Sequence, residues 1–592
     1  MCGIAGFTGP PDRELLKCYL DKMIHRGPDS EGTYEDAAVS LGVRRLRVID
    51  LVRGDQPIHN EAGDVWVVFN GEIYNYKELR EQLVQRGHKF YTTSDTETIV
   101  HLYEEKAEAL VDDLRGFFAF ALYDMKKQTL ILARDRVGKK PLYYYTRHDG
   151  GETVLRFASS LRALISADFE VRLNQRAVAH YLTYLYNPLE ESMVEGIRRL
   201  LPGHMLTFDL KSGEVRGRRF WELNLSAVDS SMSEEAALSL LESSLNEAVK
   251  LRLSADVPVG AFLSGGVDSS VVCASLSMMG AKLKTFALGF DSPGSETGFA
   301  ALVASNLDLD HREFILSPDI LRSMPEIVSS LDEPIGDPSI VPTWFLSKKV
   351  KEHVTVALTG EGGDENFFGY PWFNGGMNRY FKLPSLIRTP ARAVLRTAGV
   401  GDVGALEWYE RNQYGSLRFE QQVALRFAHF TRGEVSAILG APCPDTRKVF
   451  EDTLVAQSGL PPQRRIARLG FEQQLANDFL AKDDQMSMAS SLELRSPMLD
   501  FRFVEAVARI PDSYKRGKWL LKKAAVERYL LPKRAIYRKK GGFTIPLSEW
   551  SKDLHETVDV PLTVSQHGND YRSVVRYFGL AVLKLWKQSV LA

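Results

Sequence analysis

The chain has 592 residues, more than a single hydrophobic core usually serves, so we expect two or more domains. Its content of 44% hydrophobic and 25% charged residues is typical of a globular protein in water. A net charge of −2 without a basic block argues against nucleic-acid binding, and no apolar run approaches the length of a membrane span. The start does not resemble a signal peptide, so we expect the cytoplasm.

The four cysteines are too few and too widely spaced to predict a disulfide framework. No CxxC pair or HExxH stretch predicts a zinc site, and the twelve histidines are scattered along the chain. We therefore expect any catalytic metal to be Mg²⁺ held by carboxylates and phosphates.

The first 210 or so residues contain short apolar runs separated by turn signals and a few helical stretches. Strands are predicted at Val65–Phe69, Phe117–Tyr123 and Thr129–Ala133, and helices at Tyr76–Arg86 and Thr96–Glu105. This mixture predicts a domain of α and β layers in which neighbouring strands are antiparallel.

A predicted hairpin closes this part of the chain, running through Met205–Phe208 and turning at Ser212-Gly213. The Ser-rich stretch 224–233 then predicts a linker. We therefore expect an N-terminal domain at residues 2–215 and a C-terminal domain at residues 233–592.

Beyond the linker, short apolar strands alternate with helices. Strands are predicted at Val257–Leu263, Thr285–Phe290 and Val354–Leu358, and a helix at Ser269–Met279. Alternation of this kind predicts a parallel sheet whose ligand binds beyond the carboxyl ends of the strands. From about Gln413 onward the chain is predicted to be mainly helical.

Cys2 is the first residue with candidate chemistry. Removal of Met1 would leave an α-amine beside the Cys2 thiol, and an amine with a pKa of about 8 can act as the base for that nucleophile. A cysteine at position 2 usually has no function, so the motifs around it must show whether Cys2 is catalytic.

Five motifs occur in order around and after Cys2: MCGIAGF at 1–7, HRGPD at 25–29, RL at 45–46, FNGEIYN at 69–75 and SDTE at 94–97. Together they resemble the glutaminase domain of class II glutamine amidotransferases. The resemblance covers roughly residues 2–210 and implies an Ntn-hydrolase fold with four αββα layers.

The resemblance implies that Cys2 attacks the side-chain amide of glutamine. The Asn70 side chain and the Gly71 backbone N–H would form the oxyanion hole, where loss of one donor typically slows a reaction about 10²–10³-fold. Because Asn-Gly is also the commonest hairpin signal, we expect a turn at these two residues, with the function built on it.

Glutamine carries a carboxylate and an ammonium group. By resemblance, Arg45 binds the carboxylate as a bidentate fork, while Glu72 and Asp95 receive the ammonium and Asn70 completes the glutamine-binding set. Arg47 stands where relatives often have a small residue, and the sequence does not assign it a role.

No Walker-type phosphate loop occurs, but the segment LSGGVDSS at 263–270 lies between a predicted strand and a predicted helix. Its glycines let backbone N–H groups approach an anion at the helix start, although such a turn can also be purely structural. SGGxDS after a strand is the signature of the PP-loop ATP pyrophosphatases. This resemblance implies that the loop holds pyrophosphate, with Asp268 helping to hold Mg²⁺ because the loop lacks a lysine.

Further motifs resemble asparagine synthetases. TGEGGDE at 359–365 resembles the SGEGxDE loop, which implies that Glu361 orients the acceptor or the attacking ammonia and that Asp364 assists Mg²⁺–phosphate binding. DEPIGDPS at 332–339 and LELRSPMLD at 492–500 match segments of the same family.

The basic loop RKKGGF at 538–543 would place Lys540 on the adenylate phosphates, although a Lys-Lys run by itself is more often a solvated turn. The catalytic residues implied are Cys2, Asn70, Gly71, Glu361 and Lys540. The ATP-binding residues implied are Leu263, Ser264, Gly265, Gly266, Asp268, Ser269, Leu288, Thr359, Gly360 and Lys540, with Mg²⁺ on Asp268 and Asp364.

The whole resemblance implies a glutamine-hydrolysing asparagine synthetase. A carboxylate, that of the aspartate side chain, would be adenylated by ATP and then amidated by ammonia that reaches it through an internal channel. The expected partners are small molecules, namely glutamine, ATP and aspartate or another carboxylate, with no nucleic acid and no membrane. A homodimer remains open.

Two departures from the family pattern bear on the acceptor. Gln485 stands where relatives often have an arginine, and the region 370–469 is longer than in compact asparagine synthetases. An acceptor such as a sugar acid, a peptide carboxylate or another metabolite is therefore the alternative. Intact Cys2, Asn70 and Asp95 argue against a β-lactam-forming synthetase, and with Asp268 and Lys540 they argue against a sensor without turnover.

Overall fold

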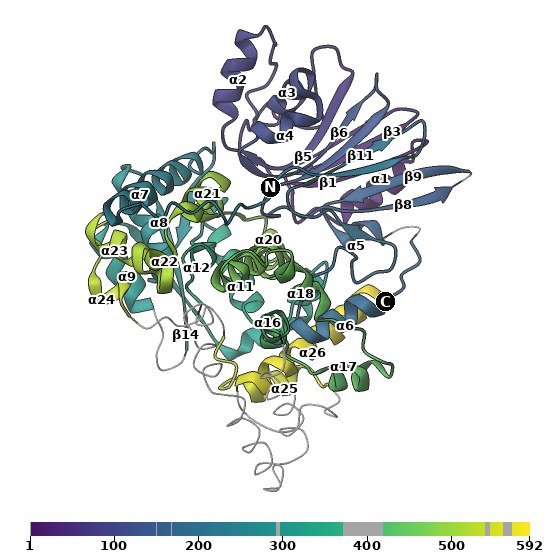
Figure 1. Cartoon of the computed structure of the whole chain (residues 1–592). Coiled ribbons are helices and arrows are strands. Elements are labelled where there is room, and N and C mark those ends of the chain that lie inside the picture. The colour runs from purple at the N-terminus through teal and green to yellow at the C-terminus, as the bar shows by residue number, and fades with distance from the viewer. Residues whose placement is uncertain are drawn as a thin grey trace.

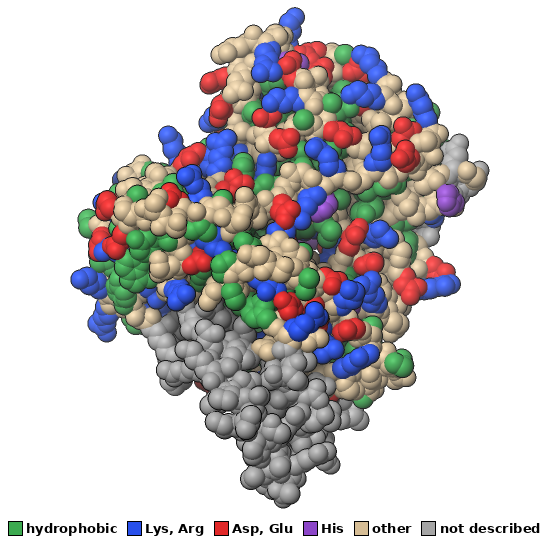
Figure 2. Space-filling view, in the orientation of Figure 1, with side chains coloured by type: hydrophobic (Ala, Val, Ile, Leu, Met, Phe, Trp, Pro, Cys, Tyr) green, Lys and Arg blue, Asp and Glu red, His purple; other side chains and the backbone are tan. Residues whose placement is uncertain are grey.

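The computed structural model describes residues 2–149, 151–166, 169–291, 297–370, 418–538, 545–560 and 571–591. Figure 1 shows the strands of the N-terminal part at the top of the view and the mainly helical C-terminal part below them. On the face drawn in Figure 2, basic and acidic side chains are interspersed over both parts, in keeping with the small net charge. No helix in the described ranges is long and apolar enough to cross a membrane.

The N-terminal part contains two six-stranded sheets, in the orders β10-β8-β9-β1-β3-β2 and β12-β11-β7-β6-β5-β4. Every neighbouring pair of strands in them is antiparallel, as predicted. The strands are β1 (Gly3–Thr8), β2 (Ser30–Glu35), β3 (Val39–Arg45), β4 (Ile58–His59), β5 (Val65–Ile73), β6 (Gly116–Asp124), β7 (Thr129–Arg134), β8 (Tyr143–Asp149), β9 (Glu152–Ala158), β10 (Arg198–Arg199), β11 (His204–Asp209) and β12 (Val215–Arg219).

Strand β6 illustrates how alternation builds the layers. Ala119 and Ala121 face the core between the two sheets, where they join Ile4 of the other sheet. Phe118 and Phe120 face the opposite way. There they pack in one core with α2 (Tyr76–Gln85), α3 (Glu97–Lys106) and α4 (Leu110–Asp113).

The outer face of the first sheet is covered by α1 (Arg13–Asp21), α5 (Leu161–Leu164) and α6 (Gln175–Tyr184). Helices therefore lie outside both sheets, which gives the four αββα layers of the Ntn-hydrolase fold. The predicted strands, the two predicted helices and the closing hairpin of β11 and β12 are confirmed.

The predicted turn at Asn70-Gly71 is wrong. Both residues lie within β5, where Asn70 pairs with Ala119 and Gly71 with Phe118 of β6. The strand continues to Ile73 because β6 pairs with it along its whole length, so tertiary pairing overrides the local turn signal. Glycine is required at position 71, since its φ is 150° and a Cβ would lie 2.1 Å from the carbonyl oxygen of Phe117.

The C-terminal part is built on a five-stranded sheet in the order β15-β14-β13-β16-β17. All neighbouring strands are parallel, as predicted. The order runs outward from β13 to β15 and then resumes on the other side of β13 with β16, which creates a topological switch point between β13 and β16. The strands are β13 (Val259–Phe262), β14 (Lys284–Phe290), β15 (Asp310–Leu316), β16 (Val356–Leu358) and β17 (Glu493–Arg495).

Helices surround this sheet and make up most of the remaining chain, as predicted. Those near the sheet include α7 (Glu234–Leu251), α8 (Val267–Met278), α9 (Thr297–Asn306), α10 (Met324–Ser329), α11 (Ile340–Lys351), α12 (Gly363–Asn366), α21 (Phe501–Arg509), α22 (Asp512–Lys515), α23 (Trp519–Glu527) and α24 (Lys533–Ile536). The others include α16 (Phe419–Phe427), α17 (Arg432–Leu439), α18 (Lys448–Val455), α19 (Pro462–Leu469), the π-helical η5 (Gly470–Phe479), α20 (Leu480–Met488), α25 (Ser551–Thr557) and α26 (Tyr571–Leu591). Residues 371–417 of the long region 370–469 lie outside the described ranges.

Asp500 connects the two parts through buried ion pairs. Its carboxylate receives two hydrogen bonds of 2.9 Å from Arg115, which precedes β6, and another from Arg252, which follows α7. It also caps α21 by accepting from the backbone N–H of Arg502. Although burial opposes ionisation, Arg252 and Arg115 hold the pKa of Asp500 at about 2.

We expect Asp500→Asn to destabilise the protein by about 3–5 kcal/mol, because it leaves two buried guanidinium groups short of a carboxylate while retaining a residue that can cap α21. The control is Asp12→Asn, which changes the exposed capping residue of α1 and should alter stability by less than about 0.5 kcal/mol. Thermal and urea unfolding of the parent and both variants measure the effect. If the two variants lowered the free energy of unfolding by similarly small amounts, the ion pairs of Asp500 with Arg115 and Arg252 would not have the importance assigned to them.

Candidate active site

Cys2 lies directly before β1 and is buried, with 5% of its surface exposed. Its backbone nitrogen donates to Asn70 Oδ1 at 3.1 Å, and its carbonyl oxygen accepts from Arg26 Nε at 3.1 Å. These contacts hold the backbone of Cys2, and its side chain belongs to the core between the two sheets. Burial raises the pKa of the Cys2 thiol, so the thiolate needs a nearby base to form at neutral pH.

Asn70 reaches Cys2 from β5, in the facing sheet. Its Nδ2 also lies 3.5 Å from Ser159 Oγ, which in turn accepts from the backbone N–H of Ile4 in β1. The amide is completely buried. The sandwich of two sheets therefore places the Asn70 amide beside a cysteine 68 residues away in sequence, and Gly71 follows Asn70 in β5.

Arg45, at the end of β3, donates to the backbone carbonyl oxygens of Ile49 and Asp50 at 2.8 Å each. It also donates to Asp55 Oδ1 at 2.7 Å, and Arg47 donates to Asp55 Oδ2 at 2.8 Å. Burial alone would raise the pKa of Asp55, but the hydrogen bonds from the two arginines lower it to about 2. Arg47 thus has a partner in the structure, and a substrate carboxylate approaching Arg45 would have to share it with Asp55.

Glu72 and Asp95 are both buried beside this site. Asp95 Oδ2 accepts from the backbone N–H of Ile73 at 2.8 Å, and burial raises the Asp95 pKa to about 6. Glu72 lies 3.4 Å from Arg495 of β17, and burial followed by repulsion from Glu493 raises its pKa well above the ordinary value. Two poorly solvated carboxyl groups therefore stand where a ligand cation would relieve the cost of their ionisation.

The second candidate site is a cavity of about 620 Å³ beyond the carboxyl ends of β13, β14 and β16. It lies at the switch point of the sheet, where α/β proteins commonly bind ligands. Among the residues predicted for ATP and acceptor chemistry, its lining includes Leu263, Ser264, Gly266, Asp268, Ser269, Leu288, Thr359, Gly360, Glu361 and Asp364. Gly265 belongs to the same loop, with a φ of 69°, and Lys540 lies outside the described residues.

Lys518 is a feature of this cavity that the sequence did not predict. It follows α22 and is 3% exposed, and its Nζ lies 2.5 Å from Asp268 Oδ2 and 2.8 Å from Asp364 Oδ1. Asp268 Oδ1 is buried without a hydrogen-bond partner among the described residues. Both loops also approach too closely for side chains, since a Cβ on Gly363 would lie 2.3 Å from Asp268 Oδ1. The glycine-rich loop has no lysine of its own, and Lys518, 250 residues further along the chain, provides the cation beside it. No local sequence motif around Lys518 predicts this contact.

The loop that carries Glu361 faces a cluster of charged residues on η5 and α20. Burial raises the Glu361 pKa to about 8, and Asp483 adds to this while Lys482 opposes it. Lys482 Nζ donates to Ser339 Oγ at 3.0 Å and lies 3.6 Å from Asp337. A π-helical segment such as η5 often occurs at a functional site.

Gln485 of α20 has a different surrounding. Its side-chain oxygen accepts from the backbone N–H of Asp332 at 2.6 Å, and Asp332 in turn accepts from Ser160 of the N-terminal part. The glutamine therefore joins structural elements at the interface and provides no charge to the cavity.

The sequence model of the asparagine synthase family matches residues 240–575, and that of the glutamine amidotransferase domain matches residues 1–221. The chain belongs to the asparagine synthase family. It is 32% identical to asparagine synthetase (glutamine-hydrolyzing) 1 of Bacillus subtilis strain 168, over 93% of this chain and 88% of that protein. A putative asparagine synthetase of Mycobacterium tuberculosis H37Rv is 33% identical, over 96% and 91%. Amidase chyE of Penicillium rubens is 28% identical, over 90% and 85%.

Membership of the asparagine synthase family makes the protein a glutamine-dependent carbon–nitrogen ligase that hydrolyses glutamine. The family also implies the use of ATP. The two constellations described above occupy the two regions that the amidotransferase and synthase sequence models match.

If the cavity binds ATP, we expect Lys518→Met to lower pyrophosphate release at least about 100-fold, because two acidic side chains would then face the phosphates without their cation. Lys523→Met is the control, since Lys523 lies on α23 outside the cavity and pairs with Glu234 and Glu527. Lys518→Arg retains the charge and should recover part of the activity. Pyrophosphate release and glutamine hydrolysis are measured in parallel, and parental pyrophosphate release by Lys518→Met would refute this role.

Proposed function

We propose that the protein is a glutamine-hydrolysing asparagine synthetase. It adenylates the side-chain carboxylate of aspartate with ATP and amidates it with ammonia from glutamine, giving asparagine, glutamate, AMP and pyrophosphate. Beyond membership of the asparagine synthase family, the proposal rests chiefly on the cavity at the switch point, where Asp268, Asp364 and Lys518 converge beside a glycine-rich loop.

In the glutaminase half, removal of Met1 turns the backbone nitrogen of Cys2 into an α-amine. This amine takes the thiol proton, and the sulfur attacks the glutamine amide. The amine then gives the proton to the leaving nitrogen, so that ammonia departs and a thioester remains for hydrolysis by water. The Asn70 side chain and the Gly71 N–H donate to the developing oxyanion. The contact between the Cys2 nitrogen and Asn70 Oδ1 supports this role by orienting both groups.

Glutamine binds with its carboxylate on Arg45 and its ammonium on Glu72 and Asp95. The raised pKa values of the two buried carboxyl groups support this assignment, because a substrate cation would compensate their charge. Asp55 accepts from both Arg45 and Arg47 and keeps the Arg45 guanidinium in place before the substrate arrives.

In the synthetase half, the acceptor carboxylate attacks the α-phosphate of ATP and pyrophosphate leaves. Ammonia then attacks the mixed anhydride, which gives the amide and AMP. The loop at 264–269 binds the departing pyrophosphate through its backbone N–H groups and the start of α8, while Lys518 neutralises its charge. Mg²⁺ would be held by Asp268 and Asp364 and would supply further positive charge to the phosphates. Asp268 Oδ1, buried without a hydrogen-bond partner in the part of the chain that the structure describes, supports this assignment.

Aspartate fits the charges at the end of the cavity near Glu361. The buried carboxyl groups in this region include Asp478, Asp483 and Glu365, and they outnumber the buried cations Lys482 and Lys139. Such an excess of carboxylates favours a ligand with an ammonium group, as an amino acid has. Lys482 lines the same cavity as Glu361 and lowers its pKa, so it is the candidate to receive the α-carboxylate.

Amidation of another carboxylate is the second candidate. The similarity to a fungal protein named an amidase favours it. A different acceptor would leave the glutaminase and adenylation steps unchanged.

The test combines the parent enzyme with Cys2→Ala and a panel of carboxylates. We expect aspartate to trigger release of AMP and pyrophosphate, and Cys2→Ala to lose glutamine hydrolysis while retaining ammonia-driven synthesis, because adenylation occurs in a separate cavity. Mass spectrometry identifies the amide. Production of ADP would refute adenylation, and glutamine hydrolysis without aspartate-dependent ATP cleavage would refute aspartate as the acceptor.

Glutamine hydrolysis should weaken below pH 6. Since the Asp95 pKa is raised to about 6, its carboxylate binds the substrate ammonium only above that pH, and kcat/KM falls as pH decreases through it. Asp95→Asn should raise KM at neutral pH and remove this acidic limb. An unchanged limb in the Asp95→Asn variant would assign the titration to another group.

A further inference from the structure

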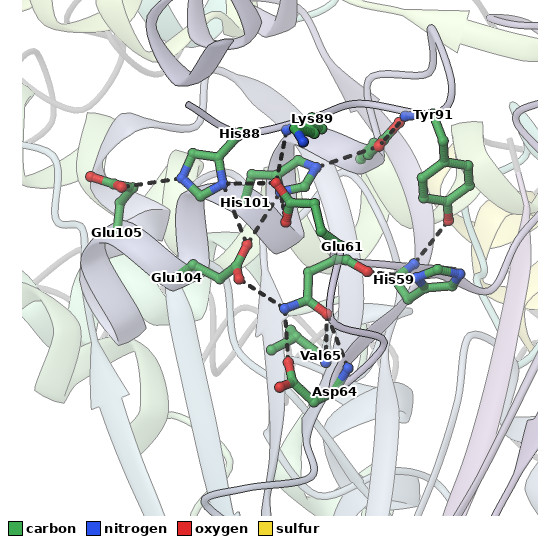
Figure 3. A network of polar contacts seen from close by, with 12 residues as sticks. His59, Glu61, Asp64, Val65, His88, Lys89, Tyr91, His101, Glu104 and Glu105 are labelled. Carbon is green, nitrogen blue, oxygen red and sulfur yellow. Dashed lines mark hydrogen bonds and ion pairs between the residues drawn. The ribbon is translucent and has the colours of Figure 1, made fainter. Parts of the chain in front are cut away.

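Four side chains that belong to neither site described above converge beside α3: Glu61, His88, His101 and Glu104 (Figure 3). One ligand atom of each lies within 4.8 Å of the others. They come from three segments, namely the turn after β4, the loop after α2 and one face of α3, where His101 and Glu104 are three residues apart. His101 is completely buried, whereas Glu61 and Glu104 are open to solvent.

Four nitrogen–oxygen separations in the cluster, which use both oxygens of Glu61, are close to the edge length of a tetrahedral metal site. His101 Nδ1 lies 3.3 Å from Glu61 Oε2 and 3.2 Å from Glu104 Oε2. His88 Nδ1 lies 3.4 Å from Glu61 Oε1 and 3.5 Å from Glu104 Oε2. With metal–ligand bonds of about 2.0–2.1 Å, the edges of a tetrahedron are about 3.3 Å long.

The second nitrogen of each imidazole ring faces its own carboxylate. His101 Nε2 lies 3.4 Å from Glu97 Oε1, and His88 Nε2 lies 3.1 Å from Glu105 Oε1. A carboxylate that accepts from Nε2–H leaves the lone pair on Nδ1, and such partners are typical of metal-binding histidines. Both rings therefore direct an Nδ1 toward the same point between Glu61 and Glu104 (Figure 3).

The carboxylates around this point are themselves held in place. Glu104 Oε1 accepts from Asn60 Nδ2 at 2.8 Å, and Glu61 Oε1 accepts from the backbone N–H of Lys89 at 2.8 Å. Glu97, behind His101, accepts from the backbone N–H groups of Tyr91 and Thr92. The orientation of the four groups is thus fixed by neighbours that contribute no ligand themselves.

We propose that Glu61, His88, His101 and Glu104 bind one divalent transition-metal ion, with Zn²⁺ as the best match. Two imidazole and two carboxylate ligands suit zinc, whereas Mg²⁺ and Ca²⁺ prefer oxygen ligands alone. Four protein ligands complete a tetrahedron, which is typical of a structural site.

The ion ties the turn after β4 and the loop at 88–92 to helix α3. Glu97, which orients His101, is separated by one residue from Asp95 in the glutamine site. Bound zinc would therefore restrict the motion of the segment that carries Asp95, although the zinc itself would not contact the substrate.

The experiment uses the full chain without a polyhistidine tag. After treatment with a chelator, the protein is titrated with Zn²⁺ in a calorimeter, desalted and analysed for metal by mass spectrometry. We expect one equivalent of zinc, a higher midpoint of thermal unfolding and, with Co²⁺ in place of zinc, the visible absorption of tetrahedral cobalt. A parent chain that retains no zinc would overturn the proposal and leave the cluster as histidine–carboxylate pairs.

Variants locate the ion. Glu61→Gln and His88→Gln alter partly exposed ligands, and each should weaken zinc binding by more than the roughly 10–100-fold that loss of an outer partner costs. The matched control is His59→Gln, because His59 lies nearby with its Nδ1 against the carbonyl oxygen of Asn60 and is not one of the four ligands. His59→Gln should bind zinc like the parent. Parental affinity in both ligand variants would overturn the proposed site.

Discussion

Contacts of the buried residue Arg495 connect the two candidate sites and hold them in one relative position. It is completely buried, and burial of a cation is costly unless every donor has a partner. Its Nε donates to Glu493 at 2.6 Å, and its Nη1 donates to the carbonyl oxygens of Arg252 and Ser254 at 2.8 Å each. Its Nη2 has no hydrogen bond among the described residues and lies 3.4 Å from Glu72 in an ion pair.

The backbone of Arg495 extends this link to the other site. Its carbonyl oxygen accepts from the N–H of Thr359 at 2.8 Å, where the loop that carries Glu361 and Asp364 begins. One residue of β17 therefore contacts a carboxylate of the proposed glutamine site through its side chain and positions a loop of the proposed ATP site through its backbone. A shift of β17 would alter both surroundings together.

Elsewhere in the interface, buried cations of the N-terminal part also pair with buried carboxylates of the C-terminal part. Arg26 and Lys139 of the N-terminal part pair with Asp484 and Asp483 of α20, at 2.8 Å and 3.4 Å. Ion pairs this deeply buried contribute less to net stability than to the choice of one geometry, because a displaced part would leave each charge unpaired. The interface thereby sets the orientation of the cavity at the switch point relative to the buried Cys2.

The sequence by itself determined what depends on local pattern: the antiparallel and parallel strand types, the glycine-rich loop after β13 and the motif residues around Cys2. It predicted a turn at Asn70-Gly71, whereas pairing with β6 keeps both residues inside a strand. Only the tertiary structure joined Lys518 to Asp268 and brought His88 to His101, because these contacts link segments whose separation no local periodicity encodes. Local preferences specify the elements, and the burial of their charged groups decides which distant elements meet.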